Sequence, residues 1–300
     1  MLDLTSMKIN DNNDNNDNGW LELALSSNKD NVKNLIEIKD RLILAYKNYE
    51  NIITEYTTNP IKSTFLQERE LLKSFYEKAP KNLNRNLLEQ RNEHLFEQCP
   101  FCGRPCKPSI LDHFLPKDLW PEFCIFPNNL VSQCDKCSTK KWSHYYSDID
   151  NSVKFIHPKF FNLLQYIGIQ IEINFPSPES IKQPDFIITF TLPRGININD
   201  KKRLSLHIKY LDIKTHIREY ITENYLYWLR VSEQKRYYVP DSLNQRIKES
   251  YTGGNNNRWD VALYLAMINN DFIINHFDSI EIKKEIQDHS DIKLEILTEE

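Results

Sequence analysis

The chain lacks several features that would assign it to common protein classes. It has only six glycines among 300 residues, which favours a mostly regular structure. No apolar run is long enough to cross a bilayer, and the first 19 residues lack the basic stretch and apolar run of a secretory signal. We therefore expect a cytoplasmic protein without membrane association. The phosphate-binding pattern G-x4-G-K-[S/T] is also missing, so an ATPase would have to be a separate protein.

A positive charge excess is missing too. The chain has 38 Lys and Arg against 42 Asp and Glu, with a pI of about 6.1. Nucleic-acid-binding domains commonly carry a basic surface, so any contact with nucleic acid would depend on local cations. The length and the hydrophobic content of 40% are sufficient for one large or two small domains with a proper core.

Four of the six cysteines form two C-x-x-C pairs with 31 residues between the pairs. The members are Cys99, Cys102, Cys134 and Cys137. Because thiols stay reduced in the cytoplasm, this spacing predicts a structural zinc site rather than disulfides. Cys106 remains an alternate ligand through a C-x3-C spacing, and Cys124 is expected to be a buried thiol. The alternative is that the four cysteines are unrelated core residues.

The pattern along the chain predicts an α+β protein with four parts. These are a disordered, low-complexity tail (1–19), a helical N-terminal region (20–95), a cysteine-containing module (96–160) and a mainly helical C-terminal region (161–300) with two strands near 167–192. Several prolines exclude a long helix in the first part of the module. We expect a strand at 109–113, a second strand at 129–132 and a helix from Cys134 to about Tyr145.

The sequence blocks CPFC, LDHFLPK, NNLV and CDKCSTKK resemble the HNH (ββα-metal) endonuclease superfamily in its four-cysteine form. The likeness covers about 45 residues. The wider chain resembles bacterial HNH proteins of roughly 300 residues, some of which act in phage defence. The resemblance implies a zinc-stapled ββα-metal module within a mainly helical protein. It also implies divalent-metal-dependent hydrolysis of DNA, as in a phage-defence or restriction effector.

The resemblance also implies roles for three residues. Asp112 would hold Mg²⁺ or another divalent ion, and His113 would be the general base. Asn129 would orient the loop and His113 by hydrogen bonding. The chemistry fits these residue types, because a neutral imidazole can take a proton from water near pH 7 and a hard cation can neutralise a leaving oxygen.

Three lysines are candidate phosphate contacts, namely Lys117, Lys140 and Lys141, with Lys141 at the family's lysine position. The alternative is that they are ordinary surface lysines. Three other histidines are expected to be structural, namely His157, His207 and His216.

One departure from the family pattern concerns the second ligand of the divalent ion. Asn or His commonly follows the last cysteine, whereas this chain has Ser138, whose hydroxyl is a weaker ligand. Ser138 would bind through water, Asp135 or His144 would help, or the site would be weakened.

Two alternative functions follow. The first is a zinc-stabilised module that binds nucleic acid or protein and has a decayed nuclease site. The second is an effector controlled by a partner, such as a separate ATPase or another defence-system subunit.

Overall fold

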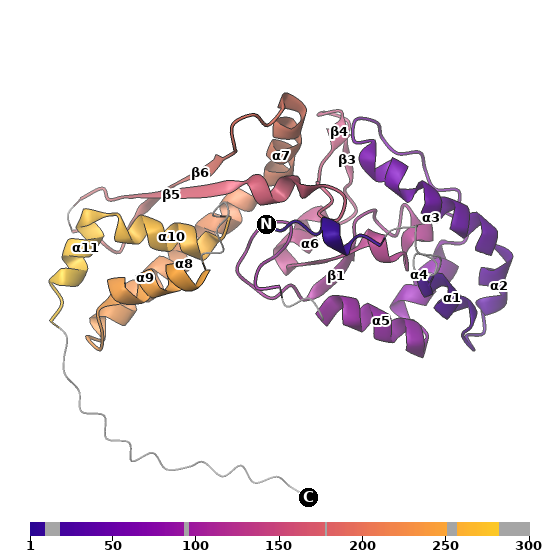
Figure 1. The fold of residues 1–300 in the computed structure, drawn as a ribbon, viewed down its shortest axis with the longest axis horizontal. Coiled ribbons are helices and arrows are strands. Elements are labelled where there is room, and N and C mark those ends of the chain that lie inside the picture. The colour runs from indigo at the N-terminus through magenta and orange to yellow at the C-terminus, as the bar shows by residue number, and fades with distance from the viewer. Residues whose placement is uncertain (10–18, 93–95, 178, 251–256, 282–300) are drawn as a thin grey trace, which may run out of the picture.

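The computed structural model describes residues 1–9, 19–92, 96–177, 179–250 and 257–281. The fold is α+β, as predicted, and its described part combines helices with three two-stranded antiparallel sheets. In Figure 1 the N-terminal helices lie on one side, the C-terminal helices on the other, and the cysteine-containing segment between them. Among the helices of the described ranges, none combines the length and the apolar character needed to cross a membrane.

In the described part of the chain, helices form the N-terminal side. They are α1 (Gly19–Leu25), α2 (Val32–Glu37), α3 (Lys39–Thr54), α4 (Arg69–Glu77) and α5 (Lys81–Asn92). Helix α3 buries Leu42, Tyr46, Tyr49 and Ile53 at steps of three and four residues. Its apolar face therefore points inward and packs against the loop that contains Phe123 and Phe126.

The described residues of the C-terminal side form a hairpin followed by helices. They are β5 (Gly168–Asn174), β6 (Asp185–Thr191), α7 (Ile198–Tyr210), α8 (Ile213–Glu233), α9 (Val239–Ser250), α10 (Trp259–Ile268) and α11 (Asp271–Asp278). The two strands pair antiparallel with Gly168 opposite Thr191, close to the predicted ranges. The long helical pattern after Ile198 is interrupted at Asp212, whose φ of 52° separates α7 from α8.

Four further short elements of the described part lie within or beside the cysteine-containing module. They are the 3-10 helices η1 (Thr5–Met7) and η4 (Asn162–Tyr166), and the paired strands β3 (Tyr146–Ser147) and β4 (Ser152–Val153).

The prediction of a disordered tail is wrong for residues 1–9. Met1 and Leu4 are buried, and the Leu4 amide donates to the carbonyl of Pro158 at 3.0 Å. Burial of these two apolar side chains offsets part of the entropy cost of ordering the segment. Residues 10–18 of the predicted tail lie outside the described residues.

Residues 99–103, which we call the cysteine knuckle, are held by donors from distant segments. The Leu2 amide donates to the Pro100 carbonyl at 3.0 Å. The His207 imidazole donates through Nε2 to the Phe101 carbonyl at 2.9 Å, and Trp259 Nε1 donates to the Cys102 carbonyl at 2.8 Å. The knuckle is thus a common attachment point for the chain start, α7 and α10.

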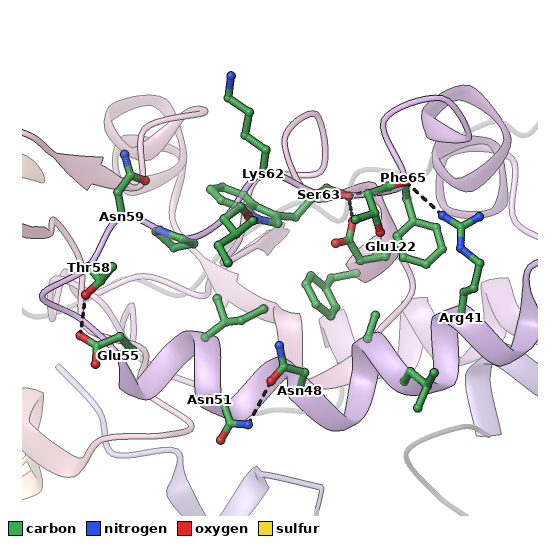
Figure 2. Close-up of a pocket in the computed structure, with 18 residues that line it drawn as sticks. Arg41, Asn48, Asn51, Glu55, Thr58, Asn59, Lys62, Ser63, Phe65 and Glu122 are labelled. Carbon is green, nitrogen blue, oxygen red and sulfur yellow. Dashed lines mark hydrogen bonds between the residues drawn. The ribbon is translucent and has the colours of Figure 1, made fainter.

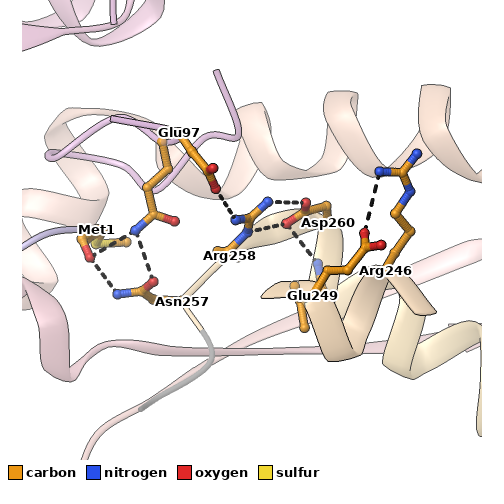
Figure 3. A network of polar contacts seen from close by, with 9 residues as sticks. Met1, Glu97, Arg246, Glu249, Asn257, Arg258 and Asp260 are labelled. Carbon is orange, nitrogen blue, oxygen red and sulfur yellow. Dashed lines mark hydrogen bonds and ion pairs between the residues drawn. The ribbon is translucent and has the colours of Figure 1, made fainter. Parts of the chain in front are cut away.

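Gly103 ends the knuckle with a φ of +76°, a conformation that favours glycine. A Cβ at this position would lie 2.6 Å from the Asn257 carbonyl oxygen, so the C-terminal side approaches the knuckle at backbone distance. Figure 3 shows the adjoining polar network. The Asn257 amide donates to the Met1 carbonyl at 2.6 Å, and Arg258 joins Glu97 at 3.1 Å to Asp260 at 2.8 Å.

Stability should depend on pH through His207. Burial lowers the pKa of His207 to about 4, from 6.5. Between these values the unfolded chain takes up a proton that the native imidazole does not. The histidine's contribution is therefore complete above pH 6.5 and declines as the pH falls toward 4, by about 3 kcal/mol in total. We expect the free energy of unfolding, measured with urea at several pH values in zinc-containing buffer, to fall less steeply for His207→Gln than for wild type. Equal slopes would contradict this assignment.

Candidate metal centre and active site

Four buried thiols meet at one point. The ligand atoms of Cys99, Cys102, Cys134 and Cys137 all lie within 4.8 Å of one another. The Sγ atoms of Cys99 and Cys137 are 3.9 Å apart, and those of Cys102 and Cys134 are 3.7 Å apart. Tetrahedral zinc with bonds of about 2.3 Å requires sulfur separations of about 3.8 Å, whereas a disulfide requires about 2.0 Å. The set can therefore bind a metal ion such as zinc.

The four thiols interact closely with one another, and Cys134 is the one that these interactions favour most as a thiolate. Hydrogen bonds from Cys102 and the neighbouring thiols lower the pKa of Cys134. The Cys134 amide donates to the Sγ of Cys99 at 3.4 Å. Cys106 is near enough to Cys134 for that thiol to raise its pKa, but it lies outside the group of four. Cys124 is buried away from the group, as predicted.

A strand, a loop, a second strand and a helix follow the first cysteine pair. Strand β1 (Ile110–His113) pairs antiparallel with β2 (Leu130–Gln133), so that Asp112 lies opposite Val131. Helix α6 (Asp135–Lys141) follows directly. This order agrees with the prediction, but the helix ends before Tyr145 because Trp142 adopts a φ of 41°.

The loop between the strands is closed by the side chain of Asn129. Its Oδ1 accepts from the Leu115 amide at 2.7 Å and from the Tyr49 hydroxyl at 2.8 Å. Its Nδ2 donates to the carbonyls of Leu115 and Phe123, each at 3.1 Å. Within the described ranges no hydrogen bond joins Asn129 to His113. Asn129 therefore holds the loop directly and reaches the histidine only through it.

Two prolines and two aromatic contacts fix the path of this loop. The 3-10 helices η2 (Pro121–Phe123) and η3 (Pro127–Asn129) both begin with proline, whose fixed φ suits a helix start. Phe126 stacks on Tyr46 of α3 with ring centroids 4.5 Å apart, and Phe123 packs against Tyr49 at 4.9 Å. The loop is thus seated on the N-terminal helices.

His113 at the end of β1 is buried and its ring is fixed. Nε2 lies 2.9 Å from the Cys124 carbonyl oxygen, and the ring of Tyr76 lies against it at 4.4 Å. A carbonyl only accepts, so Nε2 carries the hydrogen and Nδ1 keeps its lone pair. Burial lowers the pKa of His113 to about 4. The imidazole is therefore neutral at pH 7 and can accept a proton at Nδ1.

Asp112 is partly exposed, and the charge of Lys141 balances its own. Its Oδ2 accepts from Lys141 Nζ at 3.0 Å and from the side-chain amide of Gln133. Lys141 is 1% exposed and also donates to the His113 carbonyl. Contrary to the expectation of an exposed phosphate contact, Lys141 is a buried partner of the Asp112–His113 pair. Among described residues, no hydrogen bond is made to Asp112 Oδ1.

The other predicted site residues lie at the surface or near it. Ser138 is partly buried in α6, and its hydroxyl has no hydrogen-bond partner within the described part of the chain. Lys117 pairs with Glu77 at 2.6 Å, and Lys140 pairs with Asp212 at 2.8 Å.

Asp135 and His144 were considered as residues that help Ser138 to bind the divalent ion, but neither is arranged around Ser138. Asp135 is engaged by Arg104 at 2.8 Å, and His144 is exposed. His157 and His207 are buried, and each makes hydrogen bonds to backbone groups.

Sequence reasoning missed the residues that support the site from outside the motif. Tyr76 packs on His113 and Tyr49 holds Asn129, yet both belong to helices whose pattern indicated only packing. Gln133 was detectable, because it directly precedes Cys134 on the strand that faces Asp112.

A mostly apolar hollow lies beside this site, not in it. It has a volume of about 620 Å³ and lies between α3 and residues 58–65, with a mostly apolar lining. Figure 2 shows Glu122 in it, accepting a hydrogen bond from Ser63. Neither Asp112 nor His113 lines it.

Comparison with known proteins assigns no activity. No family model and no solved structure matches the chain. The protein ea31 of Escherichia phage lambda is 28% identical over 176 residues, which make up 56% of this chain and 57% of that protein. The chain thus spans little more than half the length of this curated relative.

Zinc content tests the metal centre. We expect the purified protein to contain about one zinc ion per chain and Cys102→Ser to retain well below half of that, because three thiols bind zinc far less tightly than four. Cys106→Ser and Cys124→Ser are the matched controls and should retain full zinc. Elemental analysis after gel filtration measures all four proteins. Zinc loss in Cys106→Ser but not in Cys102→Ser would show that Cys106, and not Cys102, is the fourth zinc ligand.

Stability tests the loop closure. Asn129→Asp turns an amide that donates to two carbonyls into a group that repels them, so we expect a loss of about 2–4 kcal/mol in the free energy of unfolding. Asn51→Asp on the exposed side of α3 is the control, with a change within about 0.5 kcal/mol. Urea titrations measure both. An unchanged free energy of unfolding in Asn129→Asp would contradict the role of Asn129 in loop closure.

Proposed function

We propose that the chain is an HNH endonuclease that hydrolyses DNA phosphodiester bonds with a divalent metal ion. The observation that supports this most directly is the state of His113. The histidine is neutral and buried, with Nε2 fixed by a backbone carbonyl and Nδ1 left as the acceptor. It lies next to Asp112 on a strand–loop–strand–helix unit that four clustered cysteines enclose.

In this proposal His113 takes the proton of the attacking water. Nδ1 receives the proton, and the Cys124 carbonyl keeps the ring oriented while its dipole stabilises the imidazolium that forms. Tyr76 packs on the ring and limits its rotation. Asn129 maintains the position of Cys124 because it bonds to the adjacent Phe123 carbonyl.

Asp112 would hold the catalytic divalent ion. Its carboxylate oxygen is the ligand type that Mg²⁺ prefers, and the side chain remains 25% exposed. Lys141 and Gln133 both engage Oδ2, which leaves Oδ1 as the oxygen for a cation. When bound, the ion would neutralise charge on the leaving oxygen. Ser138 occupies the family's second ligand position. Zinc at the four cysteines would be structural.

A role in phage defence or restriction, alone or with a separate ATPase, is part of the same proposal. It derives from the family resemblance, since the name of the phage relative states no activity.

Plasmid cleavage tests the activity. We expect nicking that depends on Mg²⁺, Mn²⁺ or Ni²⁺ and stops with EDTA. His113→Ala should reduce the rate by about 100-fold or more, because a positioned base typically contributes that factor. His144→Ala, an exposed histidine beyond α6, is the control and should keep the wild-type rate. Cleavage by His113→Ala at the wild-type rate would refute the assignment of the base.

The second candidate is a module with a decayed site, which Ser138 favours because its hydroxyl is a weak ligand. If wild type binds DNA without cutting it in any metal and Ser138→Asn gains cleavage, this candidate replaces the first.

A further inference from the structure

Arg91 is a cation near the site that no carboxylate of the described residues engages. Lys117, Lys140 and Lys141 each form an ion pair at 2.6–3.0 Å. Arg91, in the last turn of α5, differs from them. It has no ion pair with any described residue, and its Nε is buried without a hydrogen-bond acceptor.

Arg91 is close to the catalytic strand through Tyr76. Its positive charge acts on the Tyr76 hydroxyl and lowers the pKa of that group, against the larger opposite effect of burial. That hydroxyl donates to the carbonyl of Leu111 at 2.7 Å, one residue before Asp112. The ring of the same tyrosine lies 4.4 Å from the ring of His113. Tyr76 thus lies in the neighbourhood of Arg91 and in contact with the candidate base.

The helix that carries Arg91 is fixed to the second catalytic strand. The side-chain amide of Gln90 donates to the carbonyl of Leu130 at 2.8 Å and to that of Pro127 at 3.1 Å. Arg91 follows Gln90 directly, so its backbone position relative to β2 is set. The planar fork of a guanidinium is itself rigid, so less entropy is lost for each hydrogen bond that it forms to an anion.

An unpaired, half-buried guanidinium is unfavourable unless an anion uses it. Burial removes part of its hydration, and no described carboxylate compensates the charge. Its planar fork of donors matches two oxygens of a phosphate better than an ammonium does. The nearby acids that could repel an anion, Asp112 and Glu77, are each neutralised by a lysine.

We propose that Arg91 binds a backbone phosphate of the nucleic acid beside the bond that the water activated by His113 attacks. This inference rests on the proposed function. It means that the N-terminal helical region supplies a substrate-binding residue.

DNA binding as a function of salt concentration tests this inference. Each phosphate contact changes the slope of log K against log salt by about 0.9. In the His113→Ala background, Arg91→Gln should weaken binding of a duplex by about tenfold and reduce the slope by about one. Arg91→Lys keeps the charge but loses the fork, so it should retain the slope with a smaller loss of affinity. In the cutting enzyme, Arg91→Gln should lower kcat/KM by about tenfold or more.

Arg85→Gln is the matched control, because Arg85 lies on the same helix, is exposed and pairs with Glu89. It should leave affinity and slope unchanged. Thermal unfolding of each variant separates a structural role from phosphate binding. If Arg91→Gln lowers Tm but leaves the slope unchanged, the proposed phosphate contact is refuted.

The outcomes for Arg91 and for the nuclease are distinguishable. Wild-type cleavage combined with unchanged binding and kcat/KM in Arg91→Gln overturns this inference and leaves the nuclease intact. DNA binding with an Arg91-dependent slope, but without cleavage in any metal, supports the phosphate contact and overturns the nuclease. A protein that neither binds nor cuts DNA overturns both.

Discussion

The convergence of four thiols is the constraint on which the rest of the structure depends. The two cysteine pairs bracket β1, the loop and β2, so a metal ion at the sulfurs closes the segment that carries Asp112 and His113. The same cysteine knuckle offers its backbone carbonyls to donors from the chain start, α7 and α10. The metal would therefore fix the site and also the framework around it.

The polar side chains of the site are each held in one orientation by contacts with the protein interior. Lys141 is almost completely buried, and its charge is matched by Asp112 and by the His113 carbonyl. Such a pair contributes little net stability after desolvation, but removing either partner leaves a costly unpaired charge. Its effect is to fix the orientation of Asp112. The loop carbonyl at Cys124 does the same for the imidazole of His113.

Sequence reasoning identified what depends on short-range pattern. The cysteine spacing, the strand at Asp112 and the returning strand at Leu130 all follow from local residue type and order. It did not identify what depends on long-range packing. Nothing near Lys141 in sequence distinguishes a buried lysine from an exposed one, and Tyr76 is only one aromatic residue on an amphipathic helix. The burial of Met1 likewise needs a surface formed by residues about a hundred positions later.

The contacts of the cysteine knuckle also make it difficult for the module to keep its structure outside this protein. In an excised fragment of residues 96–160, the carbonyls of Phe101 and Cys102 would lose the donors of α7 and α10. The aromatic face of the loop would lose α3, so Phe123 and Phe126 would contact water. Transfer of the strand–loop–strand–helix unit into another protein would thus require a host that supplies equivalent donors and an equivalent aromatic surface. Evolution by shuffling would have to move the unit together with its flanking helices.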